Sequence, residues 1–220
     1  MAEEQFGLPY WLDLERPTFS RLETDKTVEA VVIGGGICGL KIARSLSRYG
    51  IKSIILEGGR IGDGASSRNQ GSINHGGALG YADCVRHFSR STAQSIWQLG
   101  LENHRLLRAE MSEFEFDCDY QIEGFTYLAR RDLPGWETQL ANYAEDYRLL
   151  KEDGFDVAFL DEQDATQHGG SPLYAGGLSY LNDAQFHSGK YVLGLGVSRL
   201  PNVTIFEDSR VQENSIYKSE

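Results

Sequence analysis

The chain has 220 residues, 40 % of them hydrophobic and 24 % charged, which is the composition of a globular protein that can bury a sizeable core. Its formal net charge of -11 argues against nucleic acid and against an anionic membrane surface as partners. No apolar run approaches the about 20 residues that a membrane-spanning helix needs.

The acidic start, Met1–Glu4, lacks the apolar core of a secretion signal. The three cysteines, Cys38, Cys84 and Cys118, are odd in number and scattered along the chain. This spacing favours reduced thiols over a disulfide framework or a metal site. We therefore expect a cytoplasmic protein that holds no metal.

The first predicted elements are a strand, a glycine-rich turn, a helix and a second strand. Val31–Ile33 predicts a short buried strand, and Ile51–Glu57 predicts a second strand with an acid at its tip. The helix between them ends near Gly50, and its expected apolar face consists of Leu40, Ile42, Ala43 and Leu46. This succession is the unit with which proteins bind a dinucleotide. The alternative is a glycine-rich turn without a ligand.

Each glycine of the turn has a distinct role in such a unit. Gly34 allows the tight turn, Gly36 lets the backbone reach the pyrophosphate, and Gly39 lets the helix lie close to the strand. The exposed amides and the positive end of the helix dipole then hold the phosphates. Glu57, at the tip of the second strand, is placed to accept hydrogen bonds from ribose hydroxyls.

The loop after Glu57 distinguishes between cofactors. A simple NAD domain passes from its second strand into a crossover helix, whereas residues 58–71 run through glycines, hydroxyls, an arginine and an amide. Ser66, Ser67 and Arg68 supply hydrogen-bond donors to a long anionic ligand. FAD, with its pyrophosphate and ribityl chain, suits this loop. A flexible surface loop is the alternative.

Three segments of this region resemble the FAD-dependent D-amino-acid oxidase and sarcosine oxidase family: Ile33–Leu40, Leu56–Glu57 and Gly62–Gly71. Within the family, the chain is most similar to bacterial amine oxidoreductases of the gamma-glutamylputrescine oxidase type. Pro9–Trp11 also resembles the short lead-in of those enzymes. The resemblance is strongest over residues 9–80 and continues more weakly to about residue 211.

The resemblance implies an α/β fold: a Rossmann-like FAD-binding domain with an inserted α+β substrate-domain portion. It also implies that the turn holds the pyrophosphate, Glu57 the adenosine ribose, and Ser66–Gly71 the pyrophosphate and the flavin side. Val211 is the candidate for a backbone contact with the adenine, although it could be an ordinary strand residue. The expected FAD-binding residues are Gly34, Gly36, Ile37, Cys38, Gly39, Glu57, Gly58, Arg60, Ser66, Ser67, Arg68, Asn69, Gln70, Gly71 and Val211.

Beyond residue 80, helices and strands alternate without a second glycine fingerprint, which suits an inserted substrate domain. A long helical segment is expected to bury one face made of Val85, Phe88, Ile96, Leu99 and Leu106. The further expected elements are strand Tyr120–Ala129 with a possible bulge at Gly124, helix Trp136–Leu150, strands Phe155–Leu160 and Leu173–Tyr180, helix Tyr191–Leu200 and strand Val203–Glu207.

These elements predict four parts: a lead-in (1–26), the first part of the FAD-binding domain (27–80), a substrate-domain portion (81–187) and a return to the FAD-binding domain (188–220). Members of the resembling family are much longer, and the strands and the flavin-capping loop of their second half have no counterpart in this sequence. The tail Asn214–Glu220 does not resemble a domain end. We therefore expect a truncated chain.

The catalytic residues cannot be derived from the sequence. The five histidines show no metal spacing; His75, which follows the loop, could contact the flavin or carry a covalent link to it, although a loop histidine is the simpler interpretation. The acids Asp161, Glu162 and Asp164 are expected in a solvated loop or a helix cap.

The sequence predicts part of an FAD-dependent oxidoreductase that converts the CH–NH bond of a small-molecule amine or amino acid to an imine. The chain alone is expected to be inactive. The alternatives are a non-catalytic remnant that binds FAD weakly and an NAD-dependent dehydrogenase.

Overall fold

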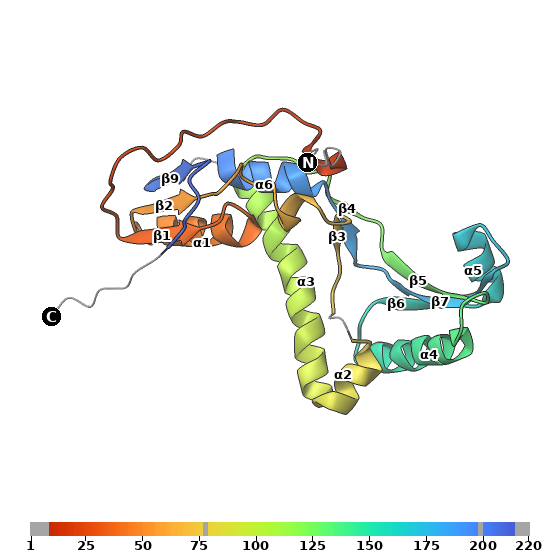
Figure 1. The fold of residues 1–220 in the computed structure, drawn as a ribbon. Coiled ribbons are helices and arrows are strands. Elements are labelled where there is room, and N and C mark those ends of the chain that lie inside the picture. The colour runs from red at the N-terminus through yellow and green to blue at the C-terminus, as the bar shows by residue number, and fades with distance from the viewer. Residues whose placement is uncertain (1–8, 77–78, 198–199, 214–220) are drawn as a thin grey trace. The chain divides into compact units, whose positions relative to one another are not determined.

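The structure, a computed structural model, describes residues 9–76, 79–197 and 200–213. The chain divides into two compact units (Figure 1). The first holds residues 1–71, 111–119 and 187–220, and the second holds residues 72–110 and 120–186. Residues 72–80, which we expected with the FAD-binding part, thus belong to the second unit, and 111–119 belong to the first. The functional domains themselves stay a prediction.

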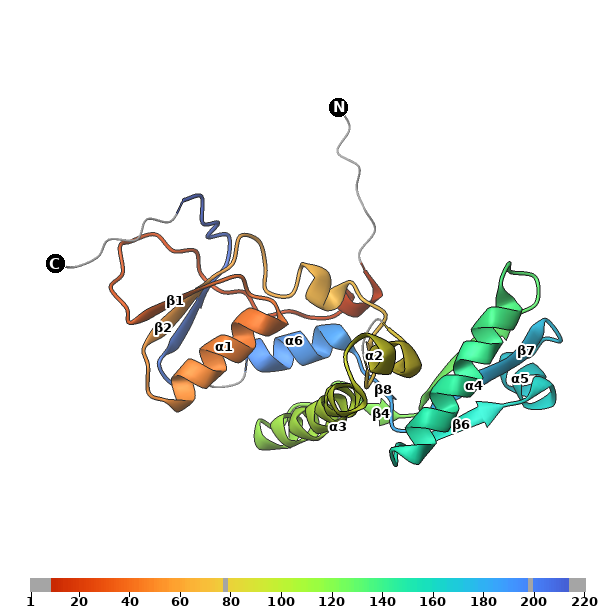
Figure 2. The same cartoon turned by 90° about the horizontal axis from the view of Figure 1, so that it is seen from below.

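The described elements of the first unit are η1 (Tyr10–Leu12), β1 (Ala30–Ile33), α1 (Ile37–Arg48), β2 (Ser53–Leu56), η2 (Ala65–Ser67), α6 (Ser188–Val197) and β9 (Val203–Phe206). Its sheet is parallel with the order β1-β2-β9, and Ser53 lies opposite both Ala30 and Val203. Helix α1 packs against this sheet, and α6 lies beside α1 in both views (Figures 1 and 2). The parallel α/β architecture is the one expected for the FAD-binding part.

The predicted elements of this unit form, with small shifts at their ends. The predicted helix Tyr191–Leu200 begins earlier, at Ser188, and its residues 198–199 lie outside the described part of the chain, as does the tail 214–220. Strand Val203–Glu207 is present and ends at Phe206. Since strand and helix alternate here with short turns between them, local pattern is enough to find them.

Helix α1 ends where the sequence predicts. Gly50 adopts φ +74, its N–H donates to the Ser47 carbonyl at 2.9 Å, and the N–H of Ile51 donates to the Leu46 carbonyl at 3.0 Å. This is a glycine cap of the kind that satisfies the last carbonyls of a helix. Leu40 is fully buried, whereas Ile42 is 52 % exposed. The prediction that Ile42 belongs to the packed face was therefore wrong.

Strand β1 lies at one edge of this sheet. Among the described strands, β1 pairs with β2 alone. Val31 is 53 % exposed and Ile33 is 59 % exposed, although both belong to an apolar strand. Continuously apolar sequences of this kind are typical of strands that are covered on both faces of a parallel sheet. An open apolar edge strand is also prone to pair with another strand.

The second unit contains four described helices: α2 (Tyr81–His87), α3 (Arg90–Glu113, whose last turn is counted with the first unit), α4 (Trp136–Glu152) and α5 (Glu162–Gly169). Its strands are β3 (Ser72–Ile73), β4 (Gln121–Ile122), β5 (Phe125–Arg130), β6 (Val157–Leu160), β7 (Tyr174–Tyr180) and β8 (Ala184–Gln185). They form two antiparallel sheets, β3-β8-β4 and β5-β7-β6. Helix α4 packs along the larger sheet (Figure 2). In the described chain, no helix is both long and apolar enough to cross a membrane.

The predicted strand Tyr120–Ala129 is two strands, β4 and β5, and the break falls at Gly124. This glycine has φ +76, and its N–H donates to the Asp183 carbonyl at 3.0 Å. The predicted bulge position is thus a full interruption, because Gly124 turns the chain from the small sheet into the larger one.

The expected apolar face of segment 85–106 was wrong in part: Val85 and Ile96 pack against the core, whereas the other three residues do not. The segment forms two helices separated near Phe88, and the large side chains of Phe88, Leu99 and Leu106 are 63 %, 68 % and 49 % exposed. The buried face of α3 instead carries Ala93, Trp97, His104, Leu107 and Glu110. The apolar pattern failed because this face includes small and polar residues that pack in the interior.

Other predictions for the second unit are confirmed. Helix α4 covers the predicted segment, and Gly154 with φ +83 follows its end. The expected acidic group lies at the start of α5. Asp161 is the cap of this helix, since its side chain accepts from the N–H of Asp164 at 2.9 Å. The core brings together the rings of Tyr81, Trp97 and Phe155, with Tyr81 and Trp97 centroids 4.8 Å apart.

We predict that His104 makes the stability of the second unit depend on pH. Burial lowers the pKa of this histidine below its ordinary 6.5; Asp183 opposes this shift, and His75 and Arg108 add to it. The folded state therefore disfavours protonation of His104. The contribution of His104 to the free energy of unfolding is complete above about pH 6.5 and is lost as the pH drops through the lowered pKa. Urea unfolding at pH 7.5 and 5.5 should show a smaller loss for His104→Gln than for the unmodified chain. Exposed His168→Gln is the control, and an equal loss in all three proteins would contradict the prediction.

Candidate functional site

The glycine turn joins β1 to α1 as a dinucleotide-binding turn does. Gly34 has φ +100, a conformation that side chains other than glycine rarely adopt. A Cβ on Gly39 would lie 2.0 Å from the Gly34 carbonyl oxygen and 3.3 Å from Cγ1 of Val32. The first turn of α1 therefore approaches β1 as closely as glycine allows, which is the contact the sequence predicts.

The start of α1 lacks a cap from its own N-cap residue, and the loop 58–71 reaches it. Gly36 is its N-cap and supplies no side-chain hydrogen bond, and the first turn holds no acidic residue. The N–H of Ile37 donates to Oγ of Ser66 at 3.0 Å, and a Cβ on Gly36 would lie 2.8 Å from that same oxygen. The turn and the loop 58–71, separate in the sequence, thus meet at a helix N-terminus, where backbone amides and the helix dipole favour phosphate.

Glu57 lies at the carboxyl end of β2 and folds back onto the turn. One carboxylate oxygen accepts from the N–H of Gly35 at 2.7 Å, and the other accepts from the N–H of Gly59 at 2.8 Å. Each oxygen keeps a second lone pair with which to accept from a ligand hydroxyl. The geometry agrees with a carboxylate that fixes the turn and faces the ribose side of a dinucleotide.

The loop after Glu57 is held mainly by its own polar groups. The Asn69 amide donates to the Ala65 and Ser66 carbonyls, and its oxygen accepts from the N–H of Gly71 at 2.8 Å. The Arg68 guanidinium donates to the Asp63 carbonyl at 2.7 Å and is exposed. This order argues against the alternative of a flexible surface loop.

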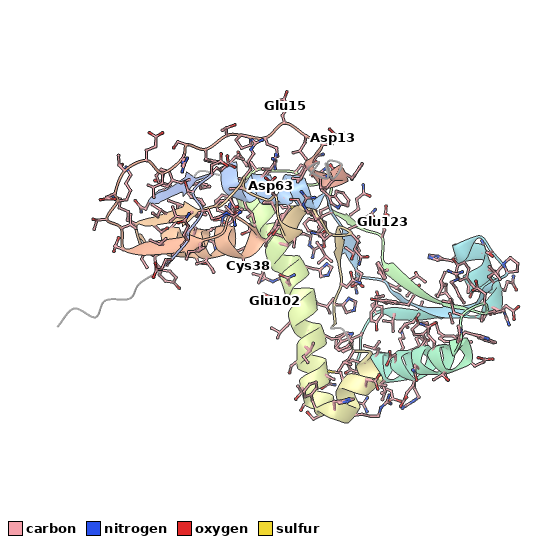
Figure 3. The ribbon with its side chains drawn as sticks, viewed as in Figure 1. Asp13, Glu15, Cys38, Asp63, Glu102 and Glu123 are labelled. Atoms are coloured by element: carbon pink, nitrogen blue, oxygen red, sulfur yellow. The ribbon has the colours of Figure 1, made fainter. Side chains whose placement is uncertain are left out.

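Arg60 differs from the expectation. Its guanidinium donates to the carbonyls of Pro17 at 2.8 Å and Arg16 at 3.3 Å, so it binds the lead-in segment. Arg16 in turn forms an ion pair with Asp63 at 2.5 Å; Figure 3 labels Asp63. In this structure Arg60 ties the lead-in to the loop.

The remaining expected residues divide into exposed and buried ones. Cys38, labelled in Figure 3, is exposed on the first turn of α1, and Gln70 is exposed in the loop. Ser67 is fully buried, and its hydroxyl has no hydrogen-bond partner among the described residues. Val211 follows β9 in the same unit and is half-buried; next to it, the Arg210 side chain lies against Gly58 at 3.4 Å from its Cβ position.

The sequence did not reveal the role of Glu207, at the end of β9. Its side chain is buried, and its two oxygens accept from the N–H groups of Phe19 at 3.0 Å and Ile61 at 2.9 Å. Arg60 Nε lies 3.9 Å from the same carboxylate. Glu207 therefore joins the lead-in, the loop and the third strand. The available signal was an acid at the end of a predicted apolar strand.

His75 belongs to the second unit and is buried. The oxygen Oδ1 of Asp183 accepts from the His75 backbone N–H at 2.9 Å and also contacts ring Nδ1. His75 thus lies in a bend after β3, as the interpretation of a loop histidine expects, and its side chain is buried. Nothing in the sequence indicates this pairing, since the two residues are 108 positions apart.

The first unit fits the phosphates of FAD. Three features belong to one turn and one loop: the close approach of α1 to the turn at Gly39, the first helical turn without an acidic residue, and the buried hydroxyl of Ser67, which has no hydrogen-bond partner among the described residues. The sequence matches the DAO family, described as FAD dependent oxidoreductase, over residues 29–218. The chain belongs to this family of FAD-dependent oxidoreductases. The resemblance, the fold class and the cofactor prediction are confirmed by this match, because FAD is the cofactor of the family.

Individual proteins that are similar to this chain in sequence or in fold support the family assignment. A probable oxidoreductase OrdL of Haemophilus influenzae is 30 % identical over 202 residues, which are 90 % of this chain and 45 % of that protein. Gamma-glutamylputrescine oxidoreductase of Escherichia coli is 29 % identical over 126 residues, which are 57 % of this chain and 30 % of that protein. Glycine oxidase from Geobacillus kaustophilus shares the fold, with a TM-score of 0.67 and 19 % identity over 82 % of this chain and 46 % of its own. The chain spans about half the length, or less, of the curated relatives it matches.

We predict that Glu57→Ala weakens FAD binding by about 1.5–3 kcal/mol, the value of a charge-assisted hydrogen bond. The loss has two sources: the expected bond to the ribose and the two amide bonds that hold the turn. Titration of FAD followed by flavin fluorescence measures it. Glu57→Gln, which keeps one oxygen acceptor, should lose less, and an unchanged affinity of both variants would contradict the assignment.

Proposed function

We propose that this chain is the FAD-holding part of an enzyme that oxidises the CH–NH bond of an amine or amino acid to an imine. The single observation that carries the proposal is the meeting of Gly36, Ser66 and the start of α1. The names of two relatives, a gamma-glutamylputrescine oxidoreductase and a glycine oxidase, support an amine or amino acid as the substrate class.

Within this proposal the chain's residues bind and orient. The amides at the start of α1 hold the pyrophosphate, Glu57 accepts from the adenosine ribose, and Ser66–Gly71 lie along the pyrophosphate and the flavin side. The backbone of Val211 contacts the adenine. Bound FAD supplies the hydride acceptor for such oxidations. The protein contributes position and exclusion of water more than acid–base groups.

The NAD-dependent alternative is less well supported. A simple NAD domain continues from its second strand into a crossover helix. Here β2 is followed by a loop with one short 3-10 helix, η2, and the next strand is β3 of the second unit. The family match also concerns FAD enzymes.

We further propose that strands outside this chain complete the FAD-binding domain. The strand pairing supports this, because β1 pairs with β2 alone among the described strands and an open edge of a parallel sheet can accept a further strand. Val31 and Ile33 are exposed on one face of β1, whereas parallel sheets are usually covered on both faces. The chain alone would then behave as the alternative of a non-catalytic remnant predicts: it would retain FAD weakly and would not turn over a substrate. We also propose a cytoplasmic location, because the three cysteines, Cys38, Cys84 and Cys118, are all free thiols.

Anaerobic flavin bleaching tests the proposal. The purified 220-residue chain and the product of the complete reading frame that contains it are each mixed with FAD and with sarcosine, D-amino acids or putrescine derivatives. We expect substrate-specific bleaching by the product that carries further strands and none by the chain alone. Rapid bleaching by the chain alone would refute the need for further strands. Absence of bleaching by every amine in both proteins would refute amine oxidation.

A further inference from the structure

The first described residues of the lead-in lie against the end of the loop 58–71. The indole Nε1 of Trp11 donates to the backbone carbonyl of Asn69 at 2.5 Å, across 58 positions of the chain. Trp11 belongs to η1, in which the N–H of Leu12 donates to the Pro9 carbonyl at 2.8 Å, and the Leu12 side chain is buried. This short helix is therefore anchored in the first unit, and its tryptophan holds a residue of the loop.

Helix α6 fixes the position of Trp11. A Cβ on Gly189, in the first turn of α6, would lie 1.7 Å from the Trp11 carbonyl oxygen, so the two backbones approach as closely as glycine allows. The rings of Trp11 and His187 meet edge-on, with centroids 5.0 Å apart. The ring of His187 is itself held, because its Nδ1 accepts from the N–H of Lys190 at 3.1 Å. The start of α6 thus orients the indole whose N–H binds the loop.

Asn69 connects the indole to the start of α1 through hydrogen bonds. Its side-chain amide donates to the carbonyls of Ala65 at 3.1 Å and Ser66 at 2.9 Å, and its side-chain oxygen accepts from the N–H of Gly71 at 2.8 Å. Oγ of Ser66 in turn accepts from the N–H of Ile37, the first residue of α1, at 3.0 Å. Such local bonds between side chain and backbone fix the shape of a loop. The end of the loop is therefore held at two points, at the start of α1 and at the lead-in.

We propose that Trp11 is a positioning residue of the FAD site. Its indole N–H holds Asn69, and through Asn69 the hydroxyl of Ser66, in the arrangement that the cofactor meets. A loop that is ordered before FAD arrives loses less conformational entropy when FAD binds, so the affinity is higher. In this role Trp11 acts through the loop and does not contact the cofactor. The inference rests on the proposed place of FAD at this turn and loop, but not on the oxidation of an amine.

Trp11→Phe in the 220-residue chain tests the proposal, because phenylalanine keeps an aromatic ring and removes the N–H donor. Calorimetric titration should show FAD binding about fivefold weaker, the value of a neutral hydrogen bond. Without FAD, hydrogen exchange of the Gly71 amide should rise about fivefold, and by more than exchange of the Ile55 amide in the central strand β2. A residue that only stabilised the fold would not raise exchange at Gly71 more than at Ile55. Trp136→Phe is the matched control: it makes the same substitution at a half-buried tryptophan of the second unit and should leave FAD affinity and Gly71 exchange unchanged.

A double-mutant cycle shows whether Trp11 acts through Asn69. Asn69→Ala removes the bonds that this side chain makes within the loop, so adding Trp11→Phe should weaken FAD binding further by less than about twofold. The unmodified chain gives a measurement that does not depend on the folding of a variant. Because coupling between two sites is reciprocal, FAD should slow hydrogen exchange of the Trp11 indole N–H and leave that of the Trp136 indole N–H unchanged.

Three results would refute the role of Trp11 while leaving the FAD site in place. Trp11→Phe could bind FAD as tightly as the unmodified chain, its effect on FAD binding could be the same with and without the Asn69 side chain, or FAD could leave exchange of the Trp11 indole N–H unchanged. Failure of the unmodified chain to bind FAD would instead refute the proposed FAD site itself.

Discussion

Gly39→Ala is expected to destabilise the first unit by about 3 kcal/mol and to remove FAD retention, because the added carbon has no room. Its position would be 2.0 Å from the Gly34 carbonyl oxygen, a backbone atom that cannot rotate away, and 3.3 Å from Val32 Cγ1. The start of α1 would have to move off β1. That movement displaces the amides of the first helical turn, on which the proposed pyrophosphate site depends.

The measurement is urea unfolding together with FAD titration. Gly64→Ala is the matched control: Gly64 lies in the same unit, is exposed, and has nothing within 4 Å of its Cβ position. We expect Gly64→Ala to retain both stability and FAD affinity. If Gly39→Ala were as stable and bound FAD as well as Gly64→Ala, the close helix–strand contact would not exist as described.

The second large effect is expected for Glu207→Ala, which should cost about 3 kcal/mol of stability. The substitution leaves the N–H groups of Phe19 and Ile61 without their acceptor and removes the carboxylate beside Arg60. The lead-in and the loop 58–71 should both loosen, since Glu207 is their common attachment to β9. Hydrogen exchange of the Phe19 and Ile61 amides should rise together.

Two comparisons make this result specific. Glu207→Gln keeps one acceptor oxygen but turns an amide N–H toward the other donor, so an intermediate loss is expected. Glu23→Ala removes an exposed acid of the lead-in and should leave stability within about 0.5 kcal/mol. Unchanged amide exchange in Glu207→Ala would show that the lead-in is held by other contacts.

The parts of the fold that could be predicted are those whose signals are local. The β1 strand, the turn and α1 follow one another within 20 residues, and each glycine has a backbone reason that the sequence displays. The cap at Asp161 and the break after α4 at Gly154 are equally local. A pattern read along the chain is sufficient in such cases.

The parts that could not be predicted depend on distant residues. Glu207 meets Phe19 across 188 positions, and His75 meets Asp183 across 108. The buried face of α3 was missed for a related reason: His104 and Glu110 are buried there, while Leu99 and Leu106 are exposed. Tertiary contacts decide which face of a helix is covered, and a hydrophobic pattern cannot show a polar residue that is satisfied inside the protein.

The most direct test of the central claim, that the first unit is built for FAD, is a calorimetric titration of the purified 220-residue chain with FAD and, separately, with NAD. The amides at the start of α1, the Glu57 contacts and the loop 58–71 predict measurable FAD binding. NAD binding is expected to be at least about tenfold weaker. The account would be contradicted if the chain bound NAD as tightly as FAD or more tightly. It would also be contradicted if FAD did not bind at concentrations at which NAD binds.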